Sequence, residues 1–178
     1  MIIAFWNLHK ALWSLVYWLT FGTVQATAPV PTLASPEEVG AYVGRLGYTG
    51  DPLSGVVDFT HAPEVLAGAI EHGTTGLLAL DCDDHAVLAY ACLKKLPGVS
   101  PQLVTLRDGS GRFGHHVICV YHRIGQPYGE LRRGAIDTNG HRELPAATPE
   151  ALCETWTAIY ASRGYRYVSA IPTPYPFP

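Results

Sequence analysis

The sequence has few charged residues and no run of basic ones. Only 15% of its 178 residues are charged, and 12 lysines and arginines against 15 aspartates and glutamates leave a net charge of −3. Proteins that hold nucleic acid by its phosphates carry a basic patch or stripe. We therefore expect no nucleic-acid partner. Internal repeats are also lacking, and the length is enough for one domain with its own hydrophobic core.

Cysteine is too sparse for a disulfide framework. The chain has four cysteines, whereas domains held together by disulfides are short and cysteine-dense. Cys92, Cys119 and Cys153 lie in apolar periodic segments, which favours small buried side chains. Cys82 differs, because it lies among polar residues at the predicted start of a helix.

The first 34 residues are predicted to form an apolar N-terminal helix and a linker. Three of the chain's four tryptophans lie in the first 21 residues. Three interpretations stay open for residues 1–22: a signal peptide, a membrane-spanning helix, or an amphipathic helix that docks on a protein assembly or a membrane surface. Pro29 and Pro31 follow among small residues, which is typical of a linker.

Caps, apolar spacing and turn residues predict the elements of the remaining chain. Four segments begin at a capping residue or a proline and are closely followed by glycine or proline, which predicts helices over residues 35–46, 64–70, 81–96 and 149–163. Three strand-like segments predict an antiparallel meander over residues 102–106, 115–123 and 131–137. We therefore predict an α+β domain over residues 35–168, followed by a proline-rich, extended tail over residues 169–178.

Cys82 is the first candidate for chemistry. It directly follows Asp81, the predicted N-cap, so it lies in the first turn of a helix. The unpaired amides and the dipole of a helix start favour an anion, which lowers the pKa of a thiol, and they can also stabilise an oxyanion. This position predicts a cysteine nucleophile that needs a base within hydrogen-bond reach. The acids Asp83 and Asp84 oppose a thiolate unless they point away or cap the helix.

Two adjacent histidines and one aspartate are candidates to complete the site. His115 and His116 begin a predicted strand whose two faces are both apolar, so alternation does not choose between them. Asp137 ends the next predicted strand, where an aspartate can begin a turn or orient a histidine. Asn139 is a weaker candidate for the orienting role.

A metal site is an alternative for the same region. Asp81, Asp83 and His85 are close in sequence, but consecutive residues at a helix start point in different directions. We therefore expect no metal and no other cofactor.

These residues resemble those of the bacterial and phage transglutaminase-like cysteine peptidases. That family has a cysteine followed by acids and an alanine-rich helix, then a strand histidine, then an aspartate. The similarity covers residues 35–140, and its motifs are residues 81–90, 115–121 and 134–140, with a further likeness at 48–66. In the family, apolar strand residues directly follow the catalytic histidine, which favours His116 over His115. Leu80 stands where the family often has glycine.

The resemblance implies a papain-like α+β fold in which the cysteine helix packs on an antiparallel sheet. It also implies a hydrolase that cleaves an amide bond of a peptide or protein through a thioester. Cys82 would attack, His116 would move the proton and Asp137 would orient the histidine. Transfer to an amine is one alternative. Another is a non-catalytic module of a virion or bacterial envelope, which the apolar N-terminus and the proline-rich tail favour.

Overall fold

The computed structural model describes residues 27–49, 60–78, 80–109, 115–124 and 131–177. Residues 1–22, which the sequence assigns to a signal, membrane or docking segment, lie outside the described residues. Within the described ranges, no helix combines the length and the hydropathy needed to cross a membrane.

The described residues form α-helices and one sheet. The α-helices are α2 (Pro36–Val43), α3 (Pro63–His72), α4 (Cys82–Leu93) and α5 (Pro149–Tyr160), with 3-10 turns at Gly44–Leu46, Thr75–Leu77 and Ala161–Arg163. The strands are β1 (Val99–Asp108), β2 (His115–Ile124), β3 (Leu131–Asp137), β4 (Gly140–Glu143) and β5 (Tyr167–Thr173). All strand pairs are antiparallel, in the order β4-β3-β2-β1-β5. The predicted α+β class is confirmed.

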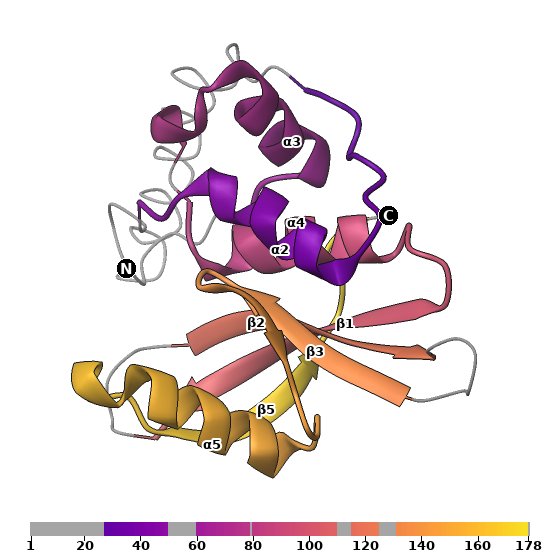
Figure 1. The fold of residues 1–178 in the computed structure, drawn as a ribbon. Helices are drawn as coiled ribbons and strands as arrows, with labels where there is room; N and C mark the ends of the chain where they lie inside the picture. The colour runs from indigo at the N-terminus through magenta and orange to yellow at the C-terminus, as the bar shows by residue number, and fades with distance from the viewer. Residues whose placement is uncertain (1–26, 50–59, 79, 110–114, 125–130, 178) are drawn as a thin grey trace, which may run out of the picture.

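The sheet lies between two helical layers (Figure 1). Helix α4 packs on one face, with α2 and α3 beside it, and α5 packs on the other. Alternation along β2 sends Val117, Cys119 and Tyr121 into the core under α4, and Ile118 and Val120 into the core under α5. Both faces of the middle of β2 are therefore buried, which explains why its sequence is apolar from Val117 to Tyr121.

Local signals at the helix starts were predicted correctly. The Ser35 side chain accepts a hydrogen bond from the Glu38 amide at 3.3 Å, and Thr148 caps α5 in the same way through the Ala151 amide. Asp81 caps α4 and accepts from the Asp83 amide at 2.9 Å. Each cap satisfies an amide that has no partner within the helix.

The sequence did not predict strands β4 and β5, and it placed one domain boundary too early. The turn at residues 138–139 leads into β4, and β5 pairs along the outer edge of β1 from Asp108 to Leu103. The predicted boundary at residue 168 is therefore wrong, because the sheet continues to Thr173. Hydrogen bonding to β1 gives this proline-containing segment the order that its composition does not suggest.

The segments before and after the predicted domain also pack on it. Val30 is buried, and its carbonyl accepts a hydrogen bond from the Lys95 ammonium. At the other end, the Tyr175 ring stacks on Tyr90 of α4, with ring centroids 4.2 Å apart. The folded unit therefore includes residues on both sides of the predicted range 35–168.

Candidate active site

The nucleophile candidate lies where α4 begins. Asp81 precedes it as the cap, and Asp84 returns to accept from the Asp81 amide at 3.2 Å, which completes a capping box. Asp84 is fully buried and also accepts from the backbone amide and the Nδ1 of His61, at 2.8 and 3.0 Å. These bonds tie the entry to α3 to the turn that carries Cys82. Asp84 therefore has a structural role and points away from the thiol.

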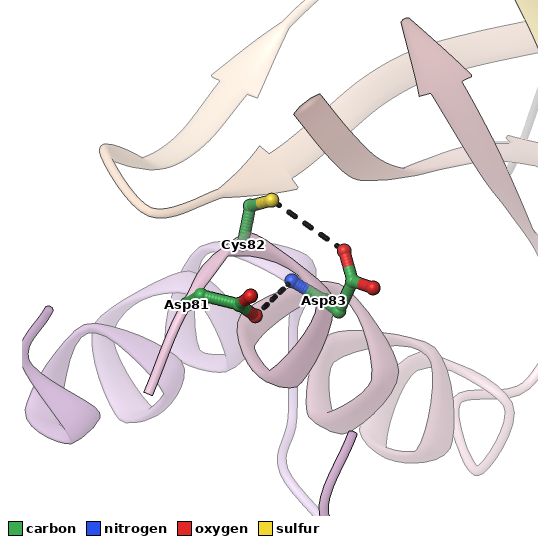
Figure 2. Close-up of side chains that lie close together, drawn as sticks. All are labelled: Asp81, Cys82 and Asp83. Atoms are coloured by element: carbon green, nitrogen blue, oxygen red, sulfur yellow. Dashed lines mark hydrogen bonds between the residues drawn. The ribbon is translucent and has the colours of Figure 1, made fainter. Parts of the chain in front are cut away.

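The thiol of Cys82 projects from the helix start toward the sheet, beside one carboxylate (Figure 2). Its Sγ donates to Asp83 Oδ1 at 3.4 Å. Burial raises the pKa of the Cys82 thiol well above its ordinary value, and the charges of Asp83 and Asp81 raise it further. A hydrogen bond with the Val117 backbone lowers the pKa of Cys82, but by less than burial and the two carboxylates raise it. The expectation of a lowered thiol pKa is therefore wrong for this arrangement, in which the thiol is protonated.

His116 and Asp137 form a buried pair. His116 Nε2 lies 3.0 Å from Asp137 Oδ2, and a carboxylate only accepts, so Nε2 carries the hydrogen. Trp156 Nε1 donates to the same oxygen at 2.8 Å, and the Asn139 amide donates to Oδ1 at 2.8 Å. Burial alone would raise the pKa of Asp137, but the bonds and charge of His116, with Trp156 and Asn139, outweigh it and lower the pKa. The carboxylate is therefore ionised and held rigidly.

His116 and Asp137 lie at the end of the sheet where β2 and β3 separate. Their pairing ends at Cys119 and Ile136, so His116 and Asp137 lie just beyond the last paired residues. His116 is buried and meets the Tyr160 ring of α5 edge-on, whereas His115 is exposed. The pair thus lies on the α5 side of the sheet, and Cys82 approaches the same open end from the α4 layer.

Cys82 and His116 line a common cavity of about 200 Å³ at this end of the sheet. His115, Thr138 and Asn139 also line the cavity. Asn139 does not replace Asp137, because its side-chain amide donates to that carboxylate and, at 2.7 Å, to the Tyr160 hydroxyl. The structure therefore brings all the predicted catalytic residues and both alternates to one place.

The residues proposed for a metal are not assembled as the sequence suggested. His85 is buried, and its Nδ1 donates a hydrogen bond to the Asp81 carbonyl at 2.7 Å. Burial lowers the pKa of His85, which keeps it neutral. Among the described residues, the group with ligand atoms within 4.8 Å of one another is Asp81, Cys82 and Asp83. Their oxygens already accept from the Asp83 amide and from the thiol, as Figure 2 shows.

Helix α5, whose sequence predicts no chemistry, supplies side chains that support the pair of His116 and Asp137. Trp156 has only 1% of its surface exposed. A buried indole requires an acceptor for its N–H, and this requirement was the signal available in the sequence. Of the other thiols, Cys92 and Cys119 are buried as predicted, and burial raises the pKa of Cys92 to about 12. Cys153 is only half-buried.

Comparison of the chain with protein-family models, with curated proteins and with solved structures finds no match.

Proposed function

We propose that the protein is a thiol-dependent hydrolase that cleaves amide bonds of a peptide or protein through Cys82, His116 and Asp137. One observation carries the proposal. Three elements that are distant in sequence bring a cysteine and a histidine to one cavity, and the histidine is bound to a buried carboxylate at 3.0 Å. A nucleophile, a base and a group that orients the base are the parts that acyl transfer requires.

The hydrogen bond to Asp137 assigns the two nitrogens of the histidine. Because Nε2–H donates to the carboxylate, Nδ1 has the lone pair that can take the thiol proton. Cys82 Sγ then forms a bond to the amide carbonyl carbon, and the imidazolium returns the proton to the nitrogen that leaves as an amine. Water attacks the thioester, gives up a proton to Nδ1, and releases the acid and the free thiol. Asp137 stabilises the imidazolium during both steps.

The high pKa of Cys82 determines how the first step proceeds. With the thiol protonated at rest, its proton moves to His116 as the bond to carbon forms, rather than from a preformed ion pair. The start of α4 turns the positive end of its dipole toward the oxyanion, and the Cys82 amide is the one amide of this turn that the capping box does not use. No described glutamine or tryptophan lines the cavity, so a backbone amide of this turn serves that purpose.

The fold is consistent with the transglutaminase-like and papain-like arrangement that the motifs suggest. A helix that begins at the cysteine packs on an antiparallel sheet, the histidine begins a strand, and the aspartate ends the next one. These features support the proposal at the level of layers and order. Hydrolysis is the primary reaction proposed, and transfer to an amine shares every step up to the thioester.

A non-catalytic scaffold is the second candidate, and one observation favours it. Burial, and after it the charges of Asp83 and Asp81, raise the pKa of the Cys82 thiol and keep it protonated, which is the opposite of an activated cysteine. In that case the pair of His116 and Asp137 would serve only the stability of the sheet end.

Alkylation of the full chain with iodoacetamide across pH distinguishes the two candidates. For a hydrolase we expect Cys82 to react faster than Cys153, the other half-buried cysteine, and to slow at least tenfold in His116→Ala. His115→Ala is the matched control, because that side chain is exposed and not bonded to Asp137. Circular dichroism verifies that each variant is folded. Slow reaction at Cys82 that is indifferent to His116 would leave the scaffold as the correct assignment.

A further inference from the structure

The wall of the cavity opposite α4 is aromatic and carries one cation. Tyr160, Tyr165 and Tyr167 line it, with the rings of Tyr165 and Tyr167 nearly parallel at 4° and Tyr160 at 77° to both. Arg163 also lines the cavity, and its guanidinium lies 5.5 Å from the centre of the Tyr160 ring. This cation–π contact holds the guanidinium against the wall of the cavity that Cys82 also lines.

The charges around the cavity favour an anion at this wall. Among the described residues that line it, Arg163 has the only permanent charge, and none is a carboxylate. The Asp137 carboxylate is buried behind its bonds to His116, Trp156 and Asn139 and does not line the cavity, and Asp83 lies on the α4 side against the thiol.

We propose that Arg163 binds a carboxylate of the substrate next to the amide that is cleaved, so that the substrate class is an acidic peptide. This inference rests on the proposed function. A guanidinium has five N–H donors in a fork that matches a carboxylate, so donors remain when it also contacts its own protein. The carboxylate is either the free end of a peptide or an acidic side chain, and both present the same group to Arg163.

The test uses pairs of alkylating reagents that differ only in one charge. N-iodoacetylglycine is compared with N-iodoacetylglycinamide for a terminal carboxylate, and the amide of N-iodoacetylaspartate with that of N-iodoacetylasparagine for a side-chain carboxylate. The rate at Cys82 is measured by mass spectrometry, and the ratio of acid to amide cancels the reactivity of the thiol itself. We expect a ratio of about ten in at least one pair, the effect of one charge-assisted hydrogen bond.

Variants show whether Arg163 produces the ratio. Arg163→Gln should bring it close to one, and Arg163→Lys should retain part of it because the charge stays and the fork is lost. Arg166→Gln is the matched control, since that exposed side chain does not line the cavity. A ratio near one in the unaltered protein, or a ratio that persists in Arg163→Gln, overturns the inference while thiol reactivity still supports the hydrolase.

A binding measurement decides the inference when Cys82 does not react. In Cys82→Ser, the Arg163 Nε–H resonance is followed by NMR during titration with N-acetylglycine, the amide of N-acetylaspartate, and their uncharged amide counterparts. A saturable shift with an acid only supports carboxylate binding even if the proposed hydrolysis fails. The absence of such a shift with either acid overturns it.

Discussion

Replacing Asp83 by asparagine tests how the site controls its thiol. The asparagine side chain keeps an oxygen that can accept from Cys82 Sγ, but it removes the charge that lies 3.4 Å away. Because Asp83 raises the pKa of Cys82, second in effect to burial, the variant should lower that pKa and increase the thiolate population. We expect faster alkylation of Cys82 at every pH below the pKa.

The size of the effect follows from the distance. At 3.4 Å, even screening as strong as in bulk water gives about 1.2 kcal/mol between two unit charges, or about eightfold in thiolate. A thiolate of lower pKa is less nucleophilic, with a Brønsted slope of about 0.4–0.5, so the net rate should rise by about threefold. Screening at this half-buried sulfur is weaker than in bulk water, so threefold is a lower bound.

The assay is the rate of iodoacetamide labelling at Cys82 between pH 6 and 9. Glu150→Gln is the control: burial and then the charge of Glu150 raise the pKa of Cys153, so this variant should accelerate alkylation of Cys153 and leave that of Cys82 unchanged. An unchanged or slower rate at Cys82 in Asp83→Asn would refute the reasoning, because it would mean that the carboxylate does not hold the proton on the sulfur.

Three further predictions concern the stability of the site, measured by urea unfolding. Trp156→Phe keeps the ring but removes the N–H bond to Asp137, and should cost about 1.5–3 kcal/mol. Asp84→Asn disrupts the buried bonds from the helix start and from His61, and should cost about 3 kcal/mol. The lowered pKa of Asp137 adds stability that is complete above the unfolded pKa and lost as pH falls through the folded one. Asp137→Asn should therefore flatten the loss of stability below about pH 4.

Each of these has a matched comparison. A loss below about 0.5 kcal/mol in Trp156→Phe would show that the indole bond to Asp137 contributes little. Asp83→Asn serves as the control for Asp84→Asn, because its partly exposed carboxylate should matter much less to folding. Equal acid sensitivity of Asp137→Asn and the unaltered protein would assign that sensitivity to other carboxylates.

Helices with capping residues and strands with apolar sequences could be predicted from the sequence. Strands β4 and β5, which depend on pairing with a distant strand or on a tight turn, could not. Serine, threonine and proline at the helix starts, and the apolar, β-branched residues of β1 and β2, are signals that depend on neighbouring residues only. The four residues of β4 are short and polar, so no alternation identifies them. Residues 169–178 were predicted to be a proline-rich tail, yet β5 accommodates Pro172 because an edge strand has a partner on one side only.

The same division applies to the site. Cys82 at a helix start and Asp137 at a strand end were recognisable from residue type and position. Strand alternation could not choose His116, because helices bury both faces of β2 and the decisive fact is where β2 leaves β3. The thiol's raised pKa also escaped prediction, since it depends on burial and on which way Asp83 turns.

The place of β5 in the sheet has a consequence for how the protein is made. Strand β5, which pairs with the outer edge of β1, comes after Cys82 and after the other four strands in the sequence. Its first residue, Tyr167, completes the wall of the cavity. A ribosome therefore releases Cys82 well before the chain that encloses it. During translation the thiol-bearing helix exists without its pocket, and the finished site forms only when the last strand has emerged.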